Sequence, residues 1–191
     1  VKEMYYYLDN TPTHSYMKML YKYPQQAFPY DKIRAESARR RKEDPEYEIM
    51  DTGIFDNNEY FDIYIEYAKA DQEDILMKVT VRNRGTVDAP ITILPTVWFR
   101  NTWSWGYENY RYKPMMNGIS KRLVEISHRK HGKFNLYFED ADELVFCENE
   151  SNMNRIYGIP STTPYPKDGI NDHVISEGTS GTVNPNQFGT K

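Results

Sequence analysis

Apolar and polar residues alternate most regularly between positions 60 and 83. Positions 61, 63, 65 and 67 are apolar or aromatic, while Asp62 and Glu66 lie between them, and this period of two predicts a strand with one polar face. A second alternating run spans 75–82, after the turn-like residues 71–74. A third run spans 91–100, where Pro95 cannot donate a backbone hydrogen bond, so we expect an edge strand or a bulge there. Three such runs joined by short polar turns predict an antiparallel meander in an all-β sandwich or barrel.

Shorter runs on both sides extend this β-rich pattern. Residues 4–8 and 15–23 are apolar and aromatic stretches separated by turn-forming residues. Residues 123–128, 133–138 and 143–147 predict three more short strands, with a break at Gly132. The sequence therefore predicts a mainly all-β, antiparallel fold that forms a single β-sandwich domain over residues 1–191.

Two segments depart from the alternation. Residues 30–43 follow Pro29 and are rich in helix-forming residues, which predicts one short surface helix. Its basic run, Arg39 to Lys42, lies where cations complement the helix dipole. Residues 151–191 are rich in Asn, Gly, Pro, Ser and Thr and predict a loop-rich segment of the kind that carries function or forms interfaces.

Composition narrows the classes of function. The formal net charge is −4 and the pI is 5.6, whereas nucleic-acid-binding domains usually carry a basic excess; we expect no nucleic-acid partner. No apolar run approaches the roughly 20 residues of a membrane span, so we expect no membrane partner. The single cysteine, Cys147, cannot form an internal disulfide, which favours a cytoplasmic protein.

Catalytic and metal-binding motifs are scarce. Of the four histidines only His128 and His131 are close in sequence, and no zinc-binding or glycine-rich phosphate-binding motif accompanies them. We therefore expect no metal and no cofactor. Glu148 and Glu150 form a carboxylate pair of the kind that a glycoside hydrolase uses, although most acidic residues are simply solvated.

Aromatic residues are the most unusual feature, with 17 tyrosines and a dense cluster between Trp98 and Tyr107. Within this cluster, Trp103 and Trp105 offer flat faces for a sugar ring, and Arg100 and Asn101 offer planar hydrogen-bonding groups for its hydroxyls. The same residue types also concentrate at interfaces between domains. Sugar contact and domain packing both stand as interpretations of Arg100, Asn101, Trp103 and Trp105.

Several of these segments together resemble a known family. Tyr5 to Lys18, Asp51 to Asp56 and Trp98 to Trp105 closely resemble the amino-terminal part of bacterial glucosidase-like proteins of glycoside hydrolase family 63. Tyr64 to Ala70, Glu148 to Glu150 and Lys167 to Asn171 fit the same pattern. The resemblance implies a β-super-sandwich domain followed by an (α/α)6 barrel that carries the acid and base carboxylates of an inverting α-glucosidase. That barrel is absent from this chain, and the sandwich is expected to be partial.

The resemblance implies a non-catalytic segment that supports the catalytic barrel in cis and shapes a site for α-glucosides. The chain opens at Val1 and stops at Lys191, and we expect it to be a segment of a longer polypeptide. The alternative is a free-standing carbohydrate-binding or interaction module. A third possibility is an enzyme complete within 191 residues that uses Glu148 and Glu150. The turn around His14 is a second, weaker candidate for the binding site or domain interface.

Overall fold

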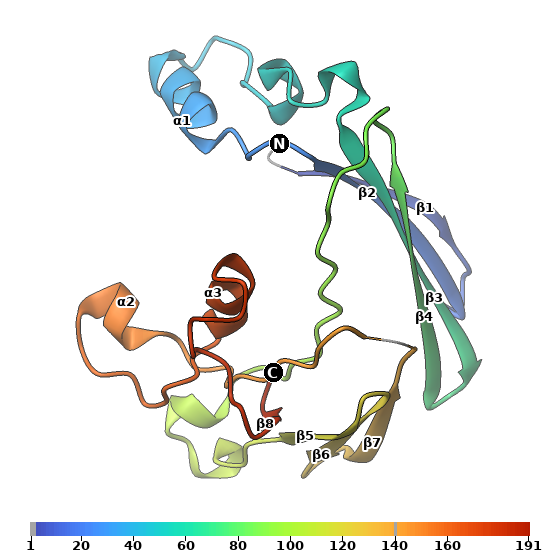
Figure 1. Ribbon diagram of the computed structural model, residues 1–191, viewed down its shortest axis with the longest axis vertical. Coiled ribbons are helices and arrows are strands. Elements are labelled where there is room, and N and C mark those ends of the chain that lie inside the picture. The colour runs from blue at the N-terminus through green and yellow to red at the C-terminus, as the bar shows by residue number, and fades with distance from the viewer. Residues whose placement is uncertain (1–2, 140) are drawn as a thin grey trace. The chain divides into compact units, whose positions relative to one another are not determined.

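The protein is mainly β, with two four-stranded antiparallel sheets. The computed structural model describes residues 3–139 and 141–191, and the chain forms two compact units that divide between Thr92 and Ile93. Each unit contains one of the sheets (Figure 1). The predicted fold class is therefore confirmed, while a single domain over 1–191 stays a prediction.

The sheet of the first unit follows the alternation in the sequence. Its strands are β1 (Met4–Asn10), β2 (Tyr16–Pro24), β3 (Tyr60–Asp71) and β4 (Asp74–Asn83), paired in the order β1-β2-β3-β4. All four predicted strands of this region are confirmed. Between β2 and β3 the chain forms α1 (Tyr30–Arg39) and two 3-10 helices, η1 (Ile49–Thr52) and η2 (Asp56–Asn58).

The surface helix is shorter than predicted. It ends at Arg39 instead of residue 43, because Arg40 adopts an extended backbone with ψ 145°. The next residues form a separate turn, in which the backbone N–H of Arg41 donates to Oδ2 of Asp44 at 2.7 Å. Good helix propensity across 40–43 is thus outweighed by a local side-chain hydrogen bond.

The second unit contains a smaller sheet and most of the irregular chain. Its strands are β5 (Met115–Ser120), β6 (Leu123–His128), β7 (Gly132–Tyr137) and β8 (Phe188–Gly189), paired in the order β7-β6-β5-β8. The strands predicted at 123–128 and 133–138 are confirmed as β6 and β7. Met116, Val124, Ile126 and Phe146 form the buried core of this unit.

Two predicted strands are absent from the described residues. Residues 91–100 and 143–147 form no strand, although Val97, Phe99 and Leu144 still pack against the core. Pro90 and Pro95 lack the N–H that a ladder requires.

The 143–147 segment bonds to scattered partners in place of one neighbouring strand. The N–H of Cys147 donates to the Lys191 carbonyl at 2.9 Å, and the Phe146 carbonyl accepts from the N–H of Asn184 at 2.7 Å. The apolar residues 144–147 favour a strand, but the backbone hydrogen bonds of this segment go to separate parts of the chain.

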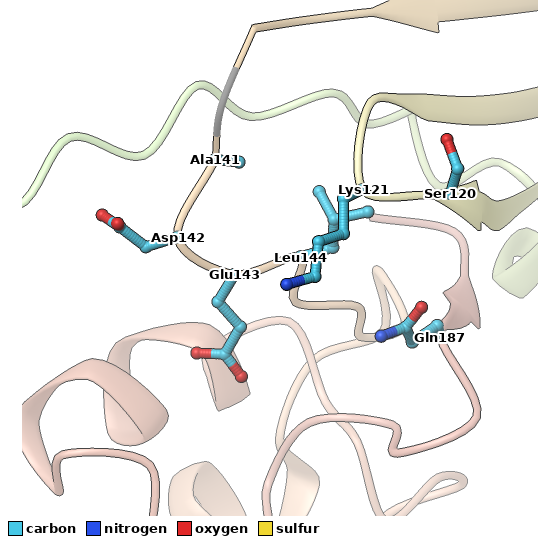
Figure 2. A pocket seen from close by; sticks show the side chains of 7 residues that line it. All are labelled: Ser120, Lys121, Ala141, Asp142, Glu143, Leu144 and Gln187. Carbon is cyan, nitrogen blue, oxygen red and sulfur yellow. The ribbon is translucent and has the colours of Figure 1, made fainter.

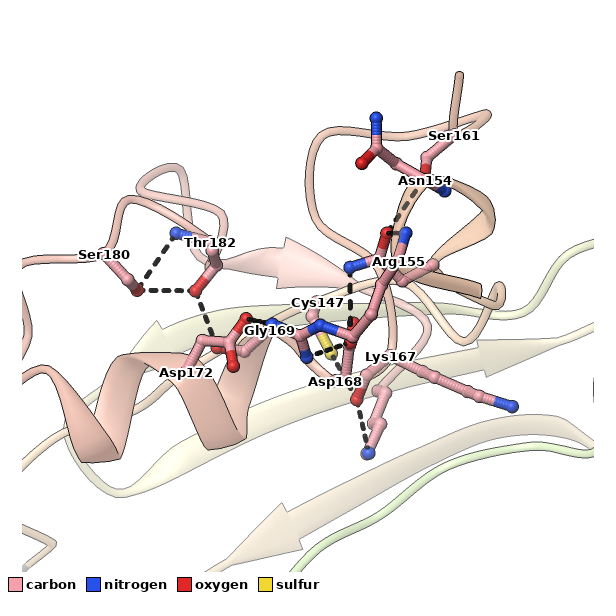
Figure 3. Close-up of polar contacts among 12 residues, drawn as sticks. Cys147, Asn154, Arg155, Ser161, Lys167, Asp168, Gly169, Asp172, Ser180 and Thr182 are labelled. Carbon is pink, nitrogen blue, oxygen red and sulfur yellow. Dashed lines mark hydrogen bonds and ion pairs between the residues drawn. The ribbon is translucent and has the colours of Figure 1, made fainter. Parts of the chain in front are cut away.

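The segment 151–191 contains two short helices that composition did not predict. They are α2 (Met153–Tyr157) and α3 (Gly169–Ile175). The Asn152 side chain caps α2 by accepting a hydrogen bond from the N–H of Arg155 at 3.1 Å. Arg155 in turn forms ion pairs with Asp168 and Asp172, which join α2 to α3 (Figure 3). Two further 3-10 helices, η3 (Trp103–Trp105) and η4 (Glu108–Tyr110), precede β5.

Candidate functional site

Trp103 and Glu150, far apart in the sequence, meet in the second unit. The indole Nε1–H of Trp103 donates to Oε1 of Glu150 at 3.0 Å. The same Oε1 forms an ion pair with the Lys113 ammonium, which lies 5.9 Å from the centre of the Trp103 ring. Glu150 is only 8% exposed. A buried carboxylate with a cation and an N–H donor is a stabilising contact, because removing either partner leaves a desolvated charge.

Amide side chains fasten the same two segments together. Asn101 donates through Nδ2 to the Asn149 carbonyl at 2.9 Å, and Asn149 donates through Nδ2 to the Phe99 carbonyl at 2.7 Å. The Oδ1 of Asn101 also accepts from the N–H of Ser104 at 3.2 Å, at the start of η3. The Asn101 side chain therefore connects the two segments, and both its amide nitrogen and its amide oxygen are hydrogen-bonded within the protein.

Glu148 lies beside this cluster but is bound mainly to the carboxyl-terminal end of the chain. Its Oε2 accepts from the Thr190 hydroxyl at 2.9 Å, and lies 3.5 Å from Nζ of Lys113. Thr190 is buried and also accepts from the N–H of Asn149 at 2.7 Å. Lys113 thus bridges both carboxylates of the predicted pair.

The outer part of the aromatic cluster is arranged differently. The Arg100 guanidinium lies 5.0 Å from the centre of the Trp105 ring, and the Trp105 ring centre lies 5.6 Å from that of Tyr110 at an angle of 55°. Tyr107 contacts Tyr110 edge-on at 6.3 Å. All three aromatic side chains are exposed. We call Arg100, Trp105, Tyr107 and Tyr110 the aromatic edge.

The structure therefore separates the two tryptophans that the sequence grouped. Trp103 and Asn101 hold the 99–103 segment against 148–150, whereas Trp105 and Arg100 form an accessible surface with two tyrosines. His14 belongs to the first unit, in the β1–β2 turn, with a left-handed φ of 54° and Nδ1 3.1 Å from Oδ1 of Asn10. Its contacts are those of a turn residue.

A small cavity lies elsewhere in the second unit. It has a volume of about 140 Å³, below the roughly 300 Å³ of ordinary ligand pockets. Glu143 lines this cavity. Its Oε2 lies 3.0 Å from Nε2 of the buried His173. The lining residues are shown in Figure 2: Ser120, Lys121, Ala141, Asp142, Glu143, Leu144 and Gln187.

Metal-binding and thiol chemistry have little support in the part of the chain that the structure describes. Across residues 3–139 and 141–191, no group of three or more His, Cys, Asp or Glu residues could hold a metal ion. Burial raises the pKa of the Cys147 thiol from 9.0 to about 11, which keeps it protonated and weakly nucleophilic near neutral pH. Cys147 is a free, buried cysteine.

Sequence reasoning missed Lys113 and Thr190, the partners of the carboxylate pair. Lys113 follows the aromatic run by a few residues and Thr190 is close to the chain end, so neither stands out as a motif. The nearest available signal was the buried, apolar character of residues 144–147, which places Glu148 and Glu150 beside a core. A buried carboxylate requires a cationic or N–H partner, and such a partner could have been expected.

Comparison with known proteins gives one informative match. No family model matches the chain, and no solved structure matches it. The chain is 34% identical, in an alignment of 225 residues, to the uncharacterized protein YMR196W of Saccharomyces cerevisiae. The match covers 100% of this chain and 21% of the yeast protein, so the chain spans about a fifth of the length of that relative. Among the described residues, no helix has the length and apolarity that crossing a membrane requires.

Proposed function

We propose that this chain is a non-catalytic β-rich segment of a longer, family 63-like α-glucosidase, in which it supports a catalytic barrel and shapes a carbohydrate site. One observation carries the proposal: Glu150, half of the carboxylate pair that could serve in hydrolysis, is buried and bound to Trp103 and Lys113. A glycosidase needs one carboxyl that donates a proton and a second that activates water or attacks the sugar. The contacts of Glu150 connect its segment to Trp103 and Lys113, which is a structural role.

The surroundings of Glu148 support the same assignment. Its Oε2 accepts a hydrogen bond from the buried Thr190 and faces the Lys113 ammonium. A general acid must reach the leaving oxygen of its substrate, and the cavity of about 140 Å³ in this unit is lined by neither Glu148 nor Glu150. The yeast relative is about five times as long as its matched part, which leaves ample chain for a separate catalytic domain.

The proposal includes a role for the aromatic edge. Trp105, Tyr107 and Tyr110 are exposed, and flat aromatic faces with a nearby guanidinium suit contact with a sugar and its hydroxyls. In the longer protein this edge would border the α-glucoside site. A cytoplasmic location is part of the same proposal, supported by a single cysteine that is a free, buried thiol.

The direct test is glucose release from maltose, kojibiose and nigerose by two samples. One is the full-length protein encoded by the gene that contains this chain, and the other is the 191-residue chain alone. We expect release, with inversion at the anomeric carbon, by the full-length protein only. Glu148→Gln in the full-length protein is expected to leave kcat within about threefold of the unmodified protein, because a residue outside the reacting atoms contributes little to the chemical step.

Three results would contradict the proposal. The first is no hydrolysis of any α-glucoside by the full-length protein. The second is hydrolysis by the 191-residue chain alone, and the third is a loss of kcat beyond about a hundredfold in Glu148→Gln, which is the size expected for a general acid or base. The second and third results would favour an enzyme complete within this chain.

A free-standing carbohydrate-binding module is the second candidate function, and the exposed aromatic edge is the observation that favours it. Isothermal titration of the 191-residue chain with the same sugars separates it from the first candidate. Saturable binding that is lost in Trp105→Ala and kept in His14→Ala would favour the module. No binding at millimolar sugar would assign the aromatic edge to packing or to a site completed by the longer protein.

A further inference from the structure

One face of the first sheet is built mainly from apolar and aromatic side chains. Residues directly opposite one another in an antiparallel pair project from the same face, so the strand register identifies the members of each face. Four cross-strand rows of this face are mainly apolar: Tyr23 and Phe61, with Asn83 opposite Phe61; Tyr5, Tyr21, Ile63 and Val81; Tyr7, Met19, Ile65 and Val79; and Met17, Tyr67 and Met77, with Asn10 opposite Met17. A further pair, Lys69 and Ile75, lies at the far end of the face.

The opposite face of the same sheet is mixed: two of its rows are charged, while a third consists of Tyr6, Leu20, Tyr64 and Thr80. The charged rows alternate in sign, and their members include Lys22, Asp62 and Arg82 in one row and Lys18, Glu66 and Lys78 in another. Lys22 pairs with Asp62 at 2.6 Å, and Lys18 with Glu66 at 3.6 Å. Charged rows of this kind are stable against water.

The apolar face is buried at one end where it lies on β3, whereas Tyr5 and Tyr23 in the same rows are exposed. Phe61 is 3% exposed and Ile63 9%, close to where the chain leaves β2 and enters β3. The connection between those strands contributes its own buried isoleucines, Ile33, Ile49 and Ile54. Its two ends are joined by a hydrogen bond from the N–H of Gln25 to the Glu59 carbonyl at 3.0 Å, and Figure 1 shows it gathered at that end of the sheet.

The other end of the apolar face is exposed. Tyr7 is 82% exposed, Ile75 59% and Met77 45%. Met17 and Tyr67, which complete the row of Met77, are also exposed. A sheet with one apolar face gains its stability by burying that face against a second layer, and contiguous apolar surface of this kind marks an interaction site.

We propose that this exposed end, formed by Tyr7, Met17, Tyr67, Ile75 and Met77, is the docking surface for an apolar surface of the longer polypeptide outside this chain. The whole chain aligns with only 21% of its yeast relative, so the relative has about four fifths of its length from which a second layer can come. The partner surface is mainly aliphatic or aromatic, because these five side chains are uncharged; Lys69, directly opposite Ile75, places a positive charge at the margin of the surface. The inference shares with the proposed function the premise of a longer protein.

The test uses neighbouring residues that project from opposite faces. In the full-length protein, Met77→Glu and Tyr7→Glu place a charge in the proposed interface, and we expect each to lower the melting temperature by at least about 4 °C. Leu76→Glu and Tyr6→Glu are matched controls on the opposite face, where the starting side chains are also exposed. We expect these controls to shift the melting temperature by less than about 2 °C. If Met77→Glu does not fold, Met77→Ser is the milder variant, with a shift of the same sign.

The full-length protein and the 191-residue chain are then compared. In the chain alone we expect Met77→Glu to shift the melting temperature by less than about 2 °C. An equal shift in chain and full-length protein, or equal shifts from Met77→Glu and Leu76→Glu, would overturn the proposal. Dimers of the chain that Met77→Glu disperses would assign the face to a second copy and also overturn it, as would a gene that encodes these 191 residues alone. Because the readout is melting temperature, the proposal can fail while α-glucoside hydrolysis is confirmed, and the reverse.

Discussion

Each of the two units is stabilised internally by a different kind of contact. In the first unit, long strands pair side by side with few register shifts, and β3 pairs with β2 and β4 along most of its length. In the second unit, single side-chain hydrogen bonds connect irregular segments. Examples are the bond from Asn149 to the Phe99 carbonyl and the bond from Trp103 to Glu150. Backbone hydrogen bonds between strands leave the side chains free to form extended faces. Side-chain hydrogen bonds between segments, in contrast, occupy polar groups that could otherwise bind a ligand.

The difference bears on function. The sheet of the first unit presents an apolar surface that suits another protein surface, and its polar groups already pair across the strands. The second unit uses Asn101, Trp103 and Glu150 internally, whereas the aromatic edge is exposed. The two proposals therefore place protein docking in the first unit and sugar contact in the second.

The largest effect is expected where the second unit brings two backbones together. A Cβ on Gly169 would lie 2.2 Å from the Thr182 carbonyl oxygen, and the Thr182 hydroxyl donates to the Gly169 carbonyl at 2.7 Å (Figure 3). We expect Gly169→Ala to lower the free energy of unfolding by about 3 kcal/mol or more, because the backbones must move apart. Urea unfolding measures it.

Gly158→Ala is the control for this substitution. Gly158 has a left-handed φ of 68° and no atom within 4 Å of an added Cβ, so its cost is backbone strain of about 1 kcal/mol. Equal losses from the two variants would show that the contact between Gly169 and Thr182 is not close.

The next effect contrasts the covered and exposed ends of the apolar face. Phe61→Ala removes a buried ring and is expected to cost about 3 to 4 kcal/mol in the 191-residue chain. Tyr7→Ala removes an exposed ring of similar size and is expected to cost less than about 0.5 kcal/mol. The same urea experiment measures both, and similar losses would mean that Tyr7 is packed within the chain.

A smaller effect separates the two tryptophans. Trp103→Phe keeps an aromatic ring but removes the N–H that Oε1 of Glu150 accepts, and we expect a loss of about 1 to 2 kcal/mol. Trp105→Phe alters an exposed ring, and we expect a change within about 0.5 kcal/mol. Thermal or urea unfolding of the two variants tests the difference; a larger loss in Trp105→Phe would reverse the roles assigned to them.

The smallest effect appears only at alkaline pH. Because burial raises the pKa of Cys147 from 9.0 to about 11, the unfolded chain loses this proton at lower pH than the folded chain. The contribution of Cys147 to stability is therefore fully present below pH 9 and is lost as the pH rises through about 11.

The measurement is the free energy of unfolding between about pH 8 and pH 11 for the protein and for Cys147→Ala. We expect a steeper alkaline decline in the unmodified protein. Parallel curves would contradict the raised pKa, and titration of the thiolate by its ultraviolet absorbance provides an independent reading.

Much of the first sheet could be predicted from sequence because its side chains alternate where the backbone pairs. Residues 61–67 and 75–82 follow a period of two that is interrupted at Tyr64 and Leu76, and both form strands. Residues 91–100 follow the same period but contain Pro95 and follow Pro90, so the side chains alternate while the backbone lacks donors for a ladder. Periodicity reports which side chains face a core; it does not report where the backbone finds its hydrogen bonds.

The candidate site could be predicted only in part for a related reason. The aromatic cluster and the carboxylates of residues 148 and 150 were identified from local composition. Their meeting depends on contacts across 47 residues for Trp103 and Glu150 and across 42 for Glu148 and Thr190, and no local pattern encodes such distant pairing. The different roles of Trp103 and Trp105 follow from the contact between Trp103 and Glu150.

The central claim is that this chain is a segment whose first sheet is completed by the rest of a longer polypeptide. Hydrogen exchange measured by mass spectrometry, on the full-length protein and on the 191-residue chain, tests it most directly. We expect peptides covering β4 (residues 74–83) to exchange at least about tenfold more slowly in the full-length protein, because docking suppresses local opening. Peptides covering β5 and β6 (residues 115–128) are expected to exchange alike in both. Equal exchange of residues 74–83 in the two samples would contradict the claim.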